Sequence, residues 1–128
     1  MARILLIDDE PLARATVRRY LQHDAHDVTE AENGAVGLKL LDDMEADLVI
    51  TDIVMPEREG LEVIRELKRI RPGLPVVAIT GGGGDASRAG SYAEWAEIIG
   101  ARAVLQKPFT RDDLRQVLAA LLPATGTD

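Results

Sequence analysis

The chain has 128 residues, no cysteine and a formal net charge of −7, from 22 acidic and 15 basic side chains. This length provides one apolar core, the absence of cysteine excludes disulfides and thiolate metal sites, and the acidic balance argues against direct binding of nucleic acid. The apolar run in "MARILLIDDE" is too short for a signal peptide or a membrane span. We therefore expect one domain in a reducing cytoplasm, with neither nucleic acid nor membrane among its partners.

Short aliphatic or β-branched runs alternate with helical patterns along the chain. In chain order, the runs predict strands over residues 3–8, 27–31, 47–52, 75–80 and 103–107. Between and after them, apolar residues recur at helical spacing over residues 13–21, 63–70, 92–99 and 114–121. This alternation predicts a doubly wound α/β fold, in which a parallel sheet carries helices on both faces.

Three local signals mark where helices begin. Pro11 is favourable in a first turn, Asn33 can cap a second helix, and "TRDD" at 110–113 matches a capping box. The final "PATGTD" has no apolar periodicity. We therefore expect residues 1–122 to form the domain and residues 123–128 to be a disordered tail.

Polar side chains follow the predicted strands at the edge where parallel α/β sheets bind ligands. They are Asp8 and Asp9 after the first strand, Asp52 after the third, Thr80 after the fourth and Lys107 after the fifth. Three carboxylates at one edge repel one another, and a hard divalent cation such as Mg²⁺ offsets that repulsion. Taken singly, each residue has a simpler interpretation: the acids as helix caps or solvated charges, the threonine as a strand former and the lysine as a surface charge.

Four segments form a combined pattern that is more specific than any one of them. They are "ILLIDDE" at 4–10, "DLVITDIVMPEREG" at 47–60, "VVAIT" at 76–80 and "LQKPF" at 105–109. In order and spacing they resemble the receiver domains of two-component response regulators, the CheY-like family, over residues 2–122. The resemblance implies a flavodoxin-like (βα)5 three-layer sandwich with strand order 2-1-3-4-5. It fits either a single-domain regulator or a receiver followed by a linker that starts at "PATGTD".

The resemblance implies that Asp52 accepts a phosphoryl group from a histidine kinase or a phosphotransfer protein, with output by contact with a further protein. Such a domain catalyses only its own phosphorylation and dephosphorylation. The resemblance also implies a Mg²⁺ ion held directly by Asp9 and Asp52, by the backbone carbonyl of Val54, and through water by Asp8. We expect a monomer or a weak dimer.

Two further residues complete the implied site. Lys107 contacts one phosphoryl oxygen as a compact charge, and Thr80 donates its hydroxyl to another. The resemblance also implies that the peptide bond between Lys107 and Pro108 is cis, which only proline makes inexpensive.

The glycines at 81–84 follow Thr80 directly, and two interpretations remain open. They form a hinge that lets the following loop move on phosphorylation, or they are a tolerated insertion in an exposed loop. Val104 stands where the family has an aromatic side chain that turns inward, and its own side chain is short and stiff. We therefore expect residues 81–99, which include Trp95, to transmit the phosphorylated state.

Two other functions remain open. A Mg²⁺-dependent phosphohydrolase of the haloacid-dehalogenase type also uses an aspartate at a strand end, but that class has a DxD pattern on the first strand where this chain has "DDE". A scaffold that binds partners without phosphorylation does not need the combined acids, threonine and lysine. Turnover of a small phosphoester would favour the first alternative, and a lack of Mg²⁺ binding would favour the second.

Overall fold

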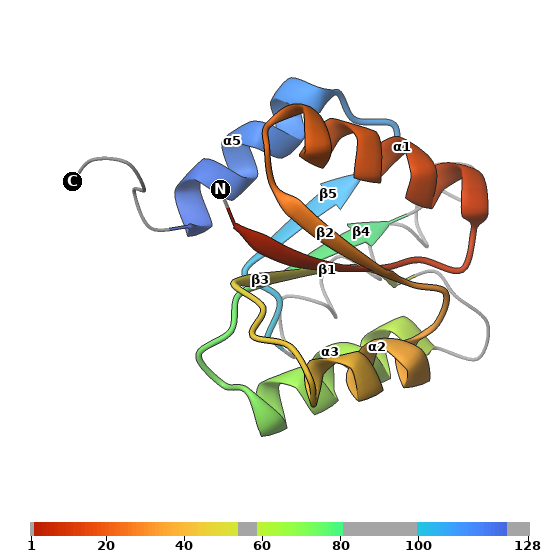
Figure 1. The fold of residues 1–128 in the computed structure, drawn as a ribbon, viewed down its shortest axis with the longest axis vertical. Helices are drawn as coiled ribbons and strands as arrows, with labels where there is room; N and C mark the ends of the chain where they lie inside the picture. Colours follow the sequence, from red (N-terminus) through yellow and green to blue (C-terminus); the bar gives the residue numbers. More distant parts are fainter. Residues whose placement is uncertain (1, 54–58, 81–99, 123–128) are drawn as a thin grey trace.

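The strands form one parallel sheet in the order β2-β1-β3-β4-β5. The computed structural model describes residues 2–53, 59–80 and 100–122, and Figure 1 draws the others as a thin grey trace. The strands are β1 (Arg3–Ile7), β2 (Asp27–Ala31), β3 (Leu48–Asp52), β4 (Val76–Thr80) and β5 (Ala103–Gln106). The predicted strands and the implied strand order are confirmed, and all but β2 are one residue shorter than predicted.

Helices cover both faces of the sheet, as the alternating pattern predicts. α1 (Pro11–His23) and α5 (Arg111–Leu121) lie on one face, and α2 (Gly34–Leu41) and α3 (Glu59–Ile70) lie on the other (Figure 1). Among the described residues, no helix combines the length and the apolar character that crossing a membrane requires. The helical pattern over residues 92–99 and the tail at 123–128 fall outside the described residues.

Side-chain caps fix where the helices begin. Asn33 precedes α2, and its side chain accepts a hydrogen bond of 2.8 Å from the N–H of Val36. Thr110 and Asp113 form a reciprocal capping box at the start of α5, with bonds of 3.0 and 2.9 Å. Pro11 lies in the first turn of α1. These predictions are confirmed, and the caps satisfy backbone N–H groups that lack a partner in the first turn of a helix.

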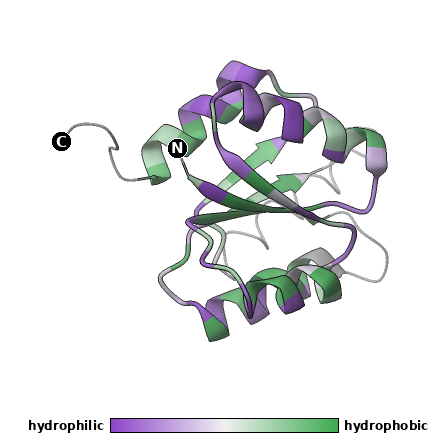
Figure 2. Cartoon of the chain, viewed as in Figure 1, coloured by the Kyte–Doolittle hydropathy of each residue, from purple (hydrophilic) through white to green (hydrophobic). Residues whose placement is uncertain are grey.

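Both faces of the sheet are buried, which explains the continuous apolar runs in its strands. Successive side chains of β1 point to opposite faces. Leu5 and Ile7 pack in the core on the α2–α3 face, whereas Ile4 and Leu6 pack in the core on the α1–α5 face. All four are fully buried, and Figure 2 shows hydrophobic residues along the sheet. Packing from both sides gives fixed positions to the residues at the carboxyl ends of the strands.

α2 approaches β1 closely at Gly37, and this contact predicts the effect of an added methyl group. A Cβ atom on Gly37 would lie 2.5 Å from Cδ1 of the fully buried Ile7. Overpacking a core costs about 1–3 kcal/mol, and the higher helix propensity of alanine returns about 1 kcal/mol. We therefore expect Gly37→Ala to lower the free energy of unfolding by about 1 kcal/mol, measured by chemical denaturation.

Gly73→Ala is the matched control, because nothing lies within 4 Å of the Cβ atom that it would add. Its stability should be unchanged or slightly higher, since alanine restricts the unfolded chain. A Gly37→Ala variant as stable as Gly73→Ala would contradict the close packing of α2 on β1.

Candidate functional site

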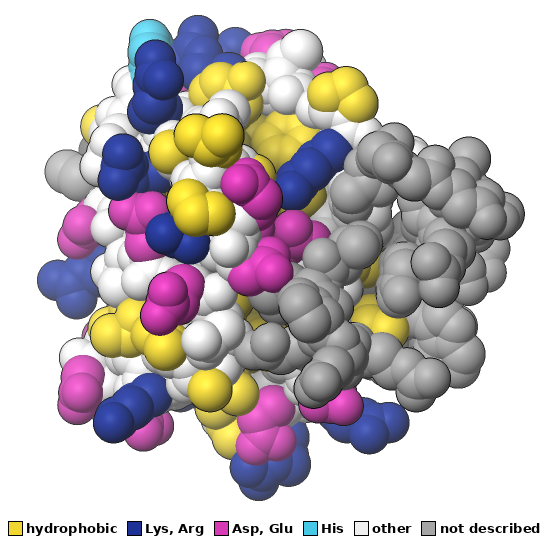
Figure 3. Space-filling model, turned by 90° about the vertical axis from the view of Figure 1, so that its right-hand side faces the viewer, with side chains coloured by type: hydrophobic (Ala, Val, Ile, Leu, Met, Phe, Trp, Pro, Cys, Tyr) yellow, Lys and Arg dark blue, Asp and Glu magenta, His cyan; other side chains and the backbone are white. Residues whose placement is uncertain are grey.

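Three aspartates meet at the carboxyl edge of the sheet, and we call Asp8, Asp9 and Asp52 the acid pocket. Asp52 is the last residue of β3, and the other two follow β1, which pairs with β3. One carboxylate oxygen from each aspartate lies within 4.8 Å of the other two. Asp8 and Asp52 are 0% and 4% exposed, whereas Asp9 is exposed. Figure 3 looks onto this edge and shows acidic side chains gathered there.

Lys107 brings a positive charge to the acid pocket from the end of β5, an edge strand of the sheet. It follows β5, which is separated from β3 by β4. Its Nζ lies 3.2 Å from Oδ2 of Asp52 and 3.8 Å from Oδ2 of Asp8. The Lys107 N–H donates to the carbonyl of Thr80 at 2.9 Å, and the Lys107–Pro108 peptide bond is cis, as the resemblance implies. The ammonium therefore lies within ion-pair distance of both buried carboxylates.

Thr80 ends β4 and is buried at the same edge of the sheet. β4 lies between β3 and β5, and its Ile79 is in register with Asp52. The fold therefore brings the predicted threonine to the edge that carries the predicted acids and lysine. The predicted Val54 carbonyl and the segment 81–99 lie outside the described residues.

The environment of Asp8 disfavours its ionised form. Its Oδ1 accepts a hydrogen bond of 2.9 Å from the backbone N–H of Glu10, but its Oδ2 has no hydrogen-bond partner among the described residues. Burial is the main reason that the pKa of Asp8 rises to about 6. The carboxylates of Asp52 and Asp9 add to this rise, and the Glu10 N–H and the Lys107 ammonium oppose it. The ionised carboxylate is therefore poorly compensated by the chain alone.

These residues fit a hard divalent cation such as Mg²⁺, which prefers carboxylate oxygens and water. The acid pocket offers a buried oxygen of Asp8 without a hydrogen bond to the described residues, beside the solvent-exposed carboxylate of Asp9. The alternative interpretation of Asp8 and Asp9 as helix caps is not supported. The cap of α1 is Glu10, whose carboxylate accepts from the N–H groups of Leu12 and Ala13.

One residue, Arg14, contacts the backbone of the acid pocket, and no sequence motif predicts this contact. Arg14 lies on α1, and its Nη1 donates to the backbone carbonyl of Asp8 at 2.7 Å. Its Nε pairs with Oε1 of Glu30 in β2 at 3.1 Å. The spacing of Arg14 and Arg18 shows that they share one helix face. It does not show that this face reaches the turn after β1, because that depends on how α1 packs.

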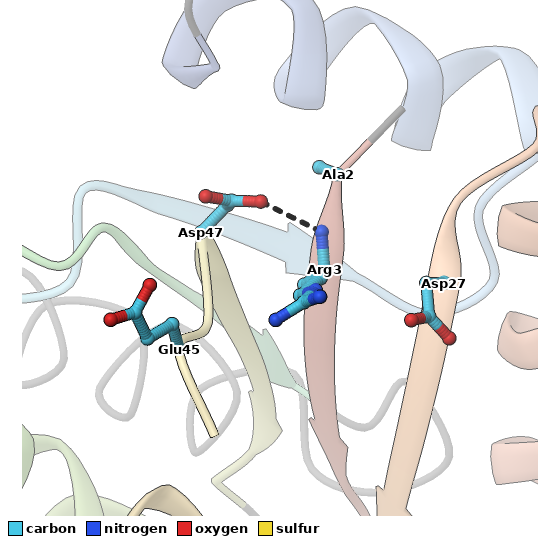
Figure 4. Close-up of a pocket in the computed structure, with 5 residues that line it drawn as sticks. All are labelled: Ala2, Arg3, Asp27, Glu45 and Asp47. Carbon is cyan, nitrogen blue, oxygen red and sulfur yellow. Dashed lines mark hydrogen bonds between the residues drawn. The ribbon is translucent and has the colours of Figure 1, made fainter.

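A hollow lies at the opposite, amino edge of the sheet (Figure 4). Its volume is about 520 Å³, and it is lined by Ala2, Arg3, Asp27, Glu45 and Asp47. Within this lining, the backbone N–H of Arg3 donates to the Asp47 carboxylate at 2.8 Å. Because parallel α/β sheets bind ligands at the carboxyl edge, the acid pocket is the candidate site.

The raised pKa of Asp8 predicts how the stability of the metal-free protein changes with pH. The folded state holds the Asp8 proton up to about pH 6, whereas the ordinary pKa is 3.8, so the folded state binds more protons between these values. Stability therefore falls as the pH rises from about 4 to about 6, by up to about 3 kcal/mol from this group. Asp8→Asn removes this titration. In EDTA, its stability relative to the original protein should be greater at pH 7 than at pH 4, as measured by chemical denaturation.

Asp27→Asn, which changes an exposed aspartate at the opposite edge, is the matched control. If the stability difference between Asp8→Asn and the original protein did not change with pH, Asp8 would not be the group that titrates in this window.

Comparison with known proteins gives a family for this architecture. Residues 4–119 match the family described as the response regulator receiver domain. The protein PilH of Pseudomonas aeruginosa is 32% identical over 124 residues, covering 95% of this chain and 98% of PilH. The transcriptional regulatory protein GlrR of Escherichia coli is 32% identical over 117 residues, covering 91% of this chain. The chain spans only 25% of the length of GlrR.

A solved structure agrees with these sequence matches. The crystal structure of a response regulator receiver domain protein from Clostridium thermocellum has a TM-score of 0.84 to this chain at 32% identity, and the match covers 94% of both chains. The strand order, the acid pocket and the lysine after β5 are features of one continuous domain that the family match spans almost completely. The chain therefore belongs to the receiver domain family of the response regulators.

Proposed function

We propose that this receiver domain accepts a phosphoryl group on Asp52 as part of a two-component phosphorelay. The observation that supports this most directly is the Lys107 ammonium, 3.2 Å from Oδ2 of Asp52 in a pocket that also contains Asp8 and Asp9. Phosphoryl transfer depends mostly on positioning and on neutralising charge. A buried carboxylate beside a lysine and two further acids suits both needs.

In the proposed reaction, a carboxylate oxygen of Asp52 attacks phosphorus, and the bond between phosphorus and the donor breaks. The donor is the phosphohistidine of a kinase or phosphotransfer protein, or a small acyl phosphate, and it leaves with the bonding electron pair. Lys107 lies close enough to Asp52 to contact an oxygen of the transferred group. Thr80, buried at the end of β4, is the proposed donor to another phosphoryl oxygen.

Asp9 and Asp52 are the proposed direct ligands of Mg²⁺, together with the backbone carbonyl of Val54. When bound, the ion would supply Lewis-acid neutralisation of the phosphoryl group and would offset the repulsion among the carboxylates. Asp9 is exposed, so its side of the pocket is open to solvent. Oδ2 of Asp8, which has no hydrogen-bond partner among the described residues, is the proposed acceptor for a water molecule of the hydrated ion.

The proposed phosphoryl donor in the cell is a histidine kinase or a histidine phosphotransfer protein in the cytoplasm. Leu12 lies in the first turn of α1, close in sequence to Asp9, and 78% of its surface is exposed. An exposed leucine beside a polar pocket offers an apolar contact to a docked protein.

We propose that residues 1–122 form the functional domain, as a monomer or a weak dimer, and that residues 123–128 form a tail.

The proposed output is contact with a further protein after phosphorylation. Val104 on β5 is half-buried and packs against the core on the α2–α3 face. A short β-branched side chain has few alternative rotamers, so it is a poor candidate for a large inward rotation. We propose that residues 81–99, which lie outside the described residues, carry the signal from Thr80.

Treatment with a small phosphodonor tests whether Asp52 is the phosphoacceptor. With Mg²⁺ and acetyl phosphate, the protein should gain one acid-labile phosphoryl group, detected by intact-mass spectrometry. Asp52→Asn should remove the modification, because an amide oxygen is a far weaker nucleophile than a carboxylate. Asp27→Asn is the control, since this residue lies at the opposite edge of the sheet.

Modification that survives Asp52→Asn unchanged would overturn the phosphoacceptor assignment. Repeated turnover of a small phosphoester would instead support the phosphohydrolase alternative. A protein that neither binds Mg²⁺ nor gains a phosphoryl group would support the scaffold alternative.

Substitutions at Asp9 and Thr80 test the proposed metal ligands. Asp9→Ala should weaken Mg²⁺ binding by about tenfold or more, whereas Thr80→Ala should change it by less than about twofold. Of these two residues, only Asp9 offers a carboxylate to the ion. Isothermal titration calorimetry without phosphodonor measures both affinities. Equal losses in the two variants would show that the ligand assignment is wrong.

A further inference from the structure

Arg14 connects the turn that carries two of the acid-pocket residues to the neighbouring strand. Its Nη1 donates to the backbone carbonyl of Asp8 at 2.7 Å, and its Nε donates to Oε1 of Glu30 at 3.1 Å. Only 20% of the Arg14 side chain is exposed. A hydrogen bond from a charged donor in a half-buried site is stronger than a neutral one at the surface.

The carbonyl that Arg14 binds belongs to the peptide unit between Asp8 and Asp9. This unit is planar, so fixing its oxygen also fixes the direction in which the chain leaves toward Asp9. The carboxylate of Asp9 is exposed and makes no hydrogen bond or ion pair with the described residues. Its position therefore depends on the backbone of the turn and not on contacts of its own side chain.

Glu30 binds the Arg14 guanidinium from a strand of the sheet. It lies in β2, opposite Leu6 of β1, and the next residue, Ala31, accepts a hydrogen bond from the Asp8 N–H at 3.1 Å. The second carboxylate oxygen of Glu30 pairs with Arg18 at 2.9 Å, so both oxygens are occupied. The planar guanidinium can bond the carbonyl and the carboxylate in fixed directions, which a lysine ammonium does not do.

We infer that Arg14 is a positioning residue for the metal site: held by Glu30, it orients the Asp8–Asp9 peptide unit and so sets the spacing of the acid pocket. This inference rests on the proposed binding of Mg²⁺ by the pocket. It predicts that loss of Arg14 disorders the turn even without metal, and that loss of Arg18, which shares Glu30 but does not touch the turn, leaves the pocket intact.

The test compares Arg14→Ala with Arg18→Ala as the matched control. Calorimetric titration should show Mg²⁺ affinity about tenfold weaker in Arg14→Ala, as for other groups that orient metal ligands, and within about twofold of the original protein in Arg18→Ala. In the metal-free proteins, NMR hydrogen exchange at the amide of Glu10, which donates to Oδ1 of Asp8, should be about tenfold faster in Arg14→Ala only. Chemical denaturation of both variants separates these effects from a general loss of stability.

Arg14→Lys keeps the positive charge and the aliphatic part of the side chain but loses the planar guanidinium. Its Mg²⁺ affinity and amide exchange should therefore resemble those of Arg14→Ala more than those of the original protein. This variant also carries the test if Arg14→Ala does not fold. Unchanged Mg²⁺ affinity in both Arg14 variants, or equal losses in Arg14→Ala and Arg18→Ala, would overturn the inference. If the original protein bound no Mg²⁺, the proposed function would fail, and unchanged exchange at Glu10 would separately refute the positioning role.

Discussion

Two buried carboxylates share one ammonium, and the rest of the site depends on this shared charge. Nζ of Lys107 lies 3.2 Å from Asp52 and 3.8 Å from Asp8, and both aspartates are almost completely buried. An unpaired buried charge costs several kcal/mol, and the nearby ammonium lowers the cost of placing two carboxylates at this edge. One ammonium does not neutralise two carboxylates, and the exposed carboxylate of Asp9 adds a third negative charge. The pocket therefore keeps an excess of negative charge that favours a divalent cation.

The hydrophobic core provides the stability that such a site requires. β1 and β3, which carry the acids, pack against helices on both faces, and their apolar side chains are fully buried. Burying one leucine or isoleucine side chain contributes about 1.5–3 kcal/mol. The raised pKa of Asp8 corresponds to a cost of up to about 3 kcal/mol, which is of the same order as the burial of two such side chains. Three neighbouring carboxylates can therefore persist at the edge of a sheet whose interior is apolar and fully buried.

The sequence predicted the strands, their order and the meeting of distant charged residues at one edge of the sheet, but it did not predict a contact that depends on how a helix packs. The strands and the caps at Asn33 and Thr110 follow from local apolar runs and capping patterns. The strand order follows from the resemblance, and the meeting of the charged residues follows from the rule that parallel sheets bind ligands at their carboxyl edge. Asp8 was expected as the last residue of a strand, but the ladder between β1 and β2 ends one residue earlier, at Ile7 and Ala31. The contact of Arg14 with the Asp8 carbonyl could not be predicted, because it depends on the rotation and packing of α1.

The start of α1 and the geometry of the acid pocket depend on the same residue. The side chain of Glu10 caps the helix by accepting from the N–H groups of Leu12 and Ala13, and its own N–H donates to Oδ1 of Asp8. A short acid directly before a helix ordinarily serves as its cap. Because Glu10 takes that position, the two aspartates before it are free to face the strand edge. If Asp9 were the cap instead, its carboxylate would turn toward backbone N–H groups, and the acid pocket would lose its solvent-exposed member.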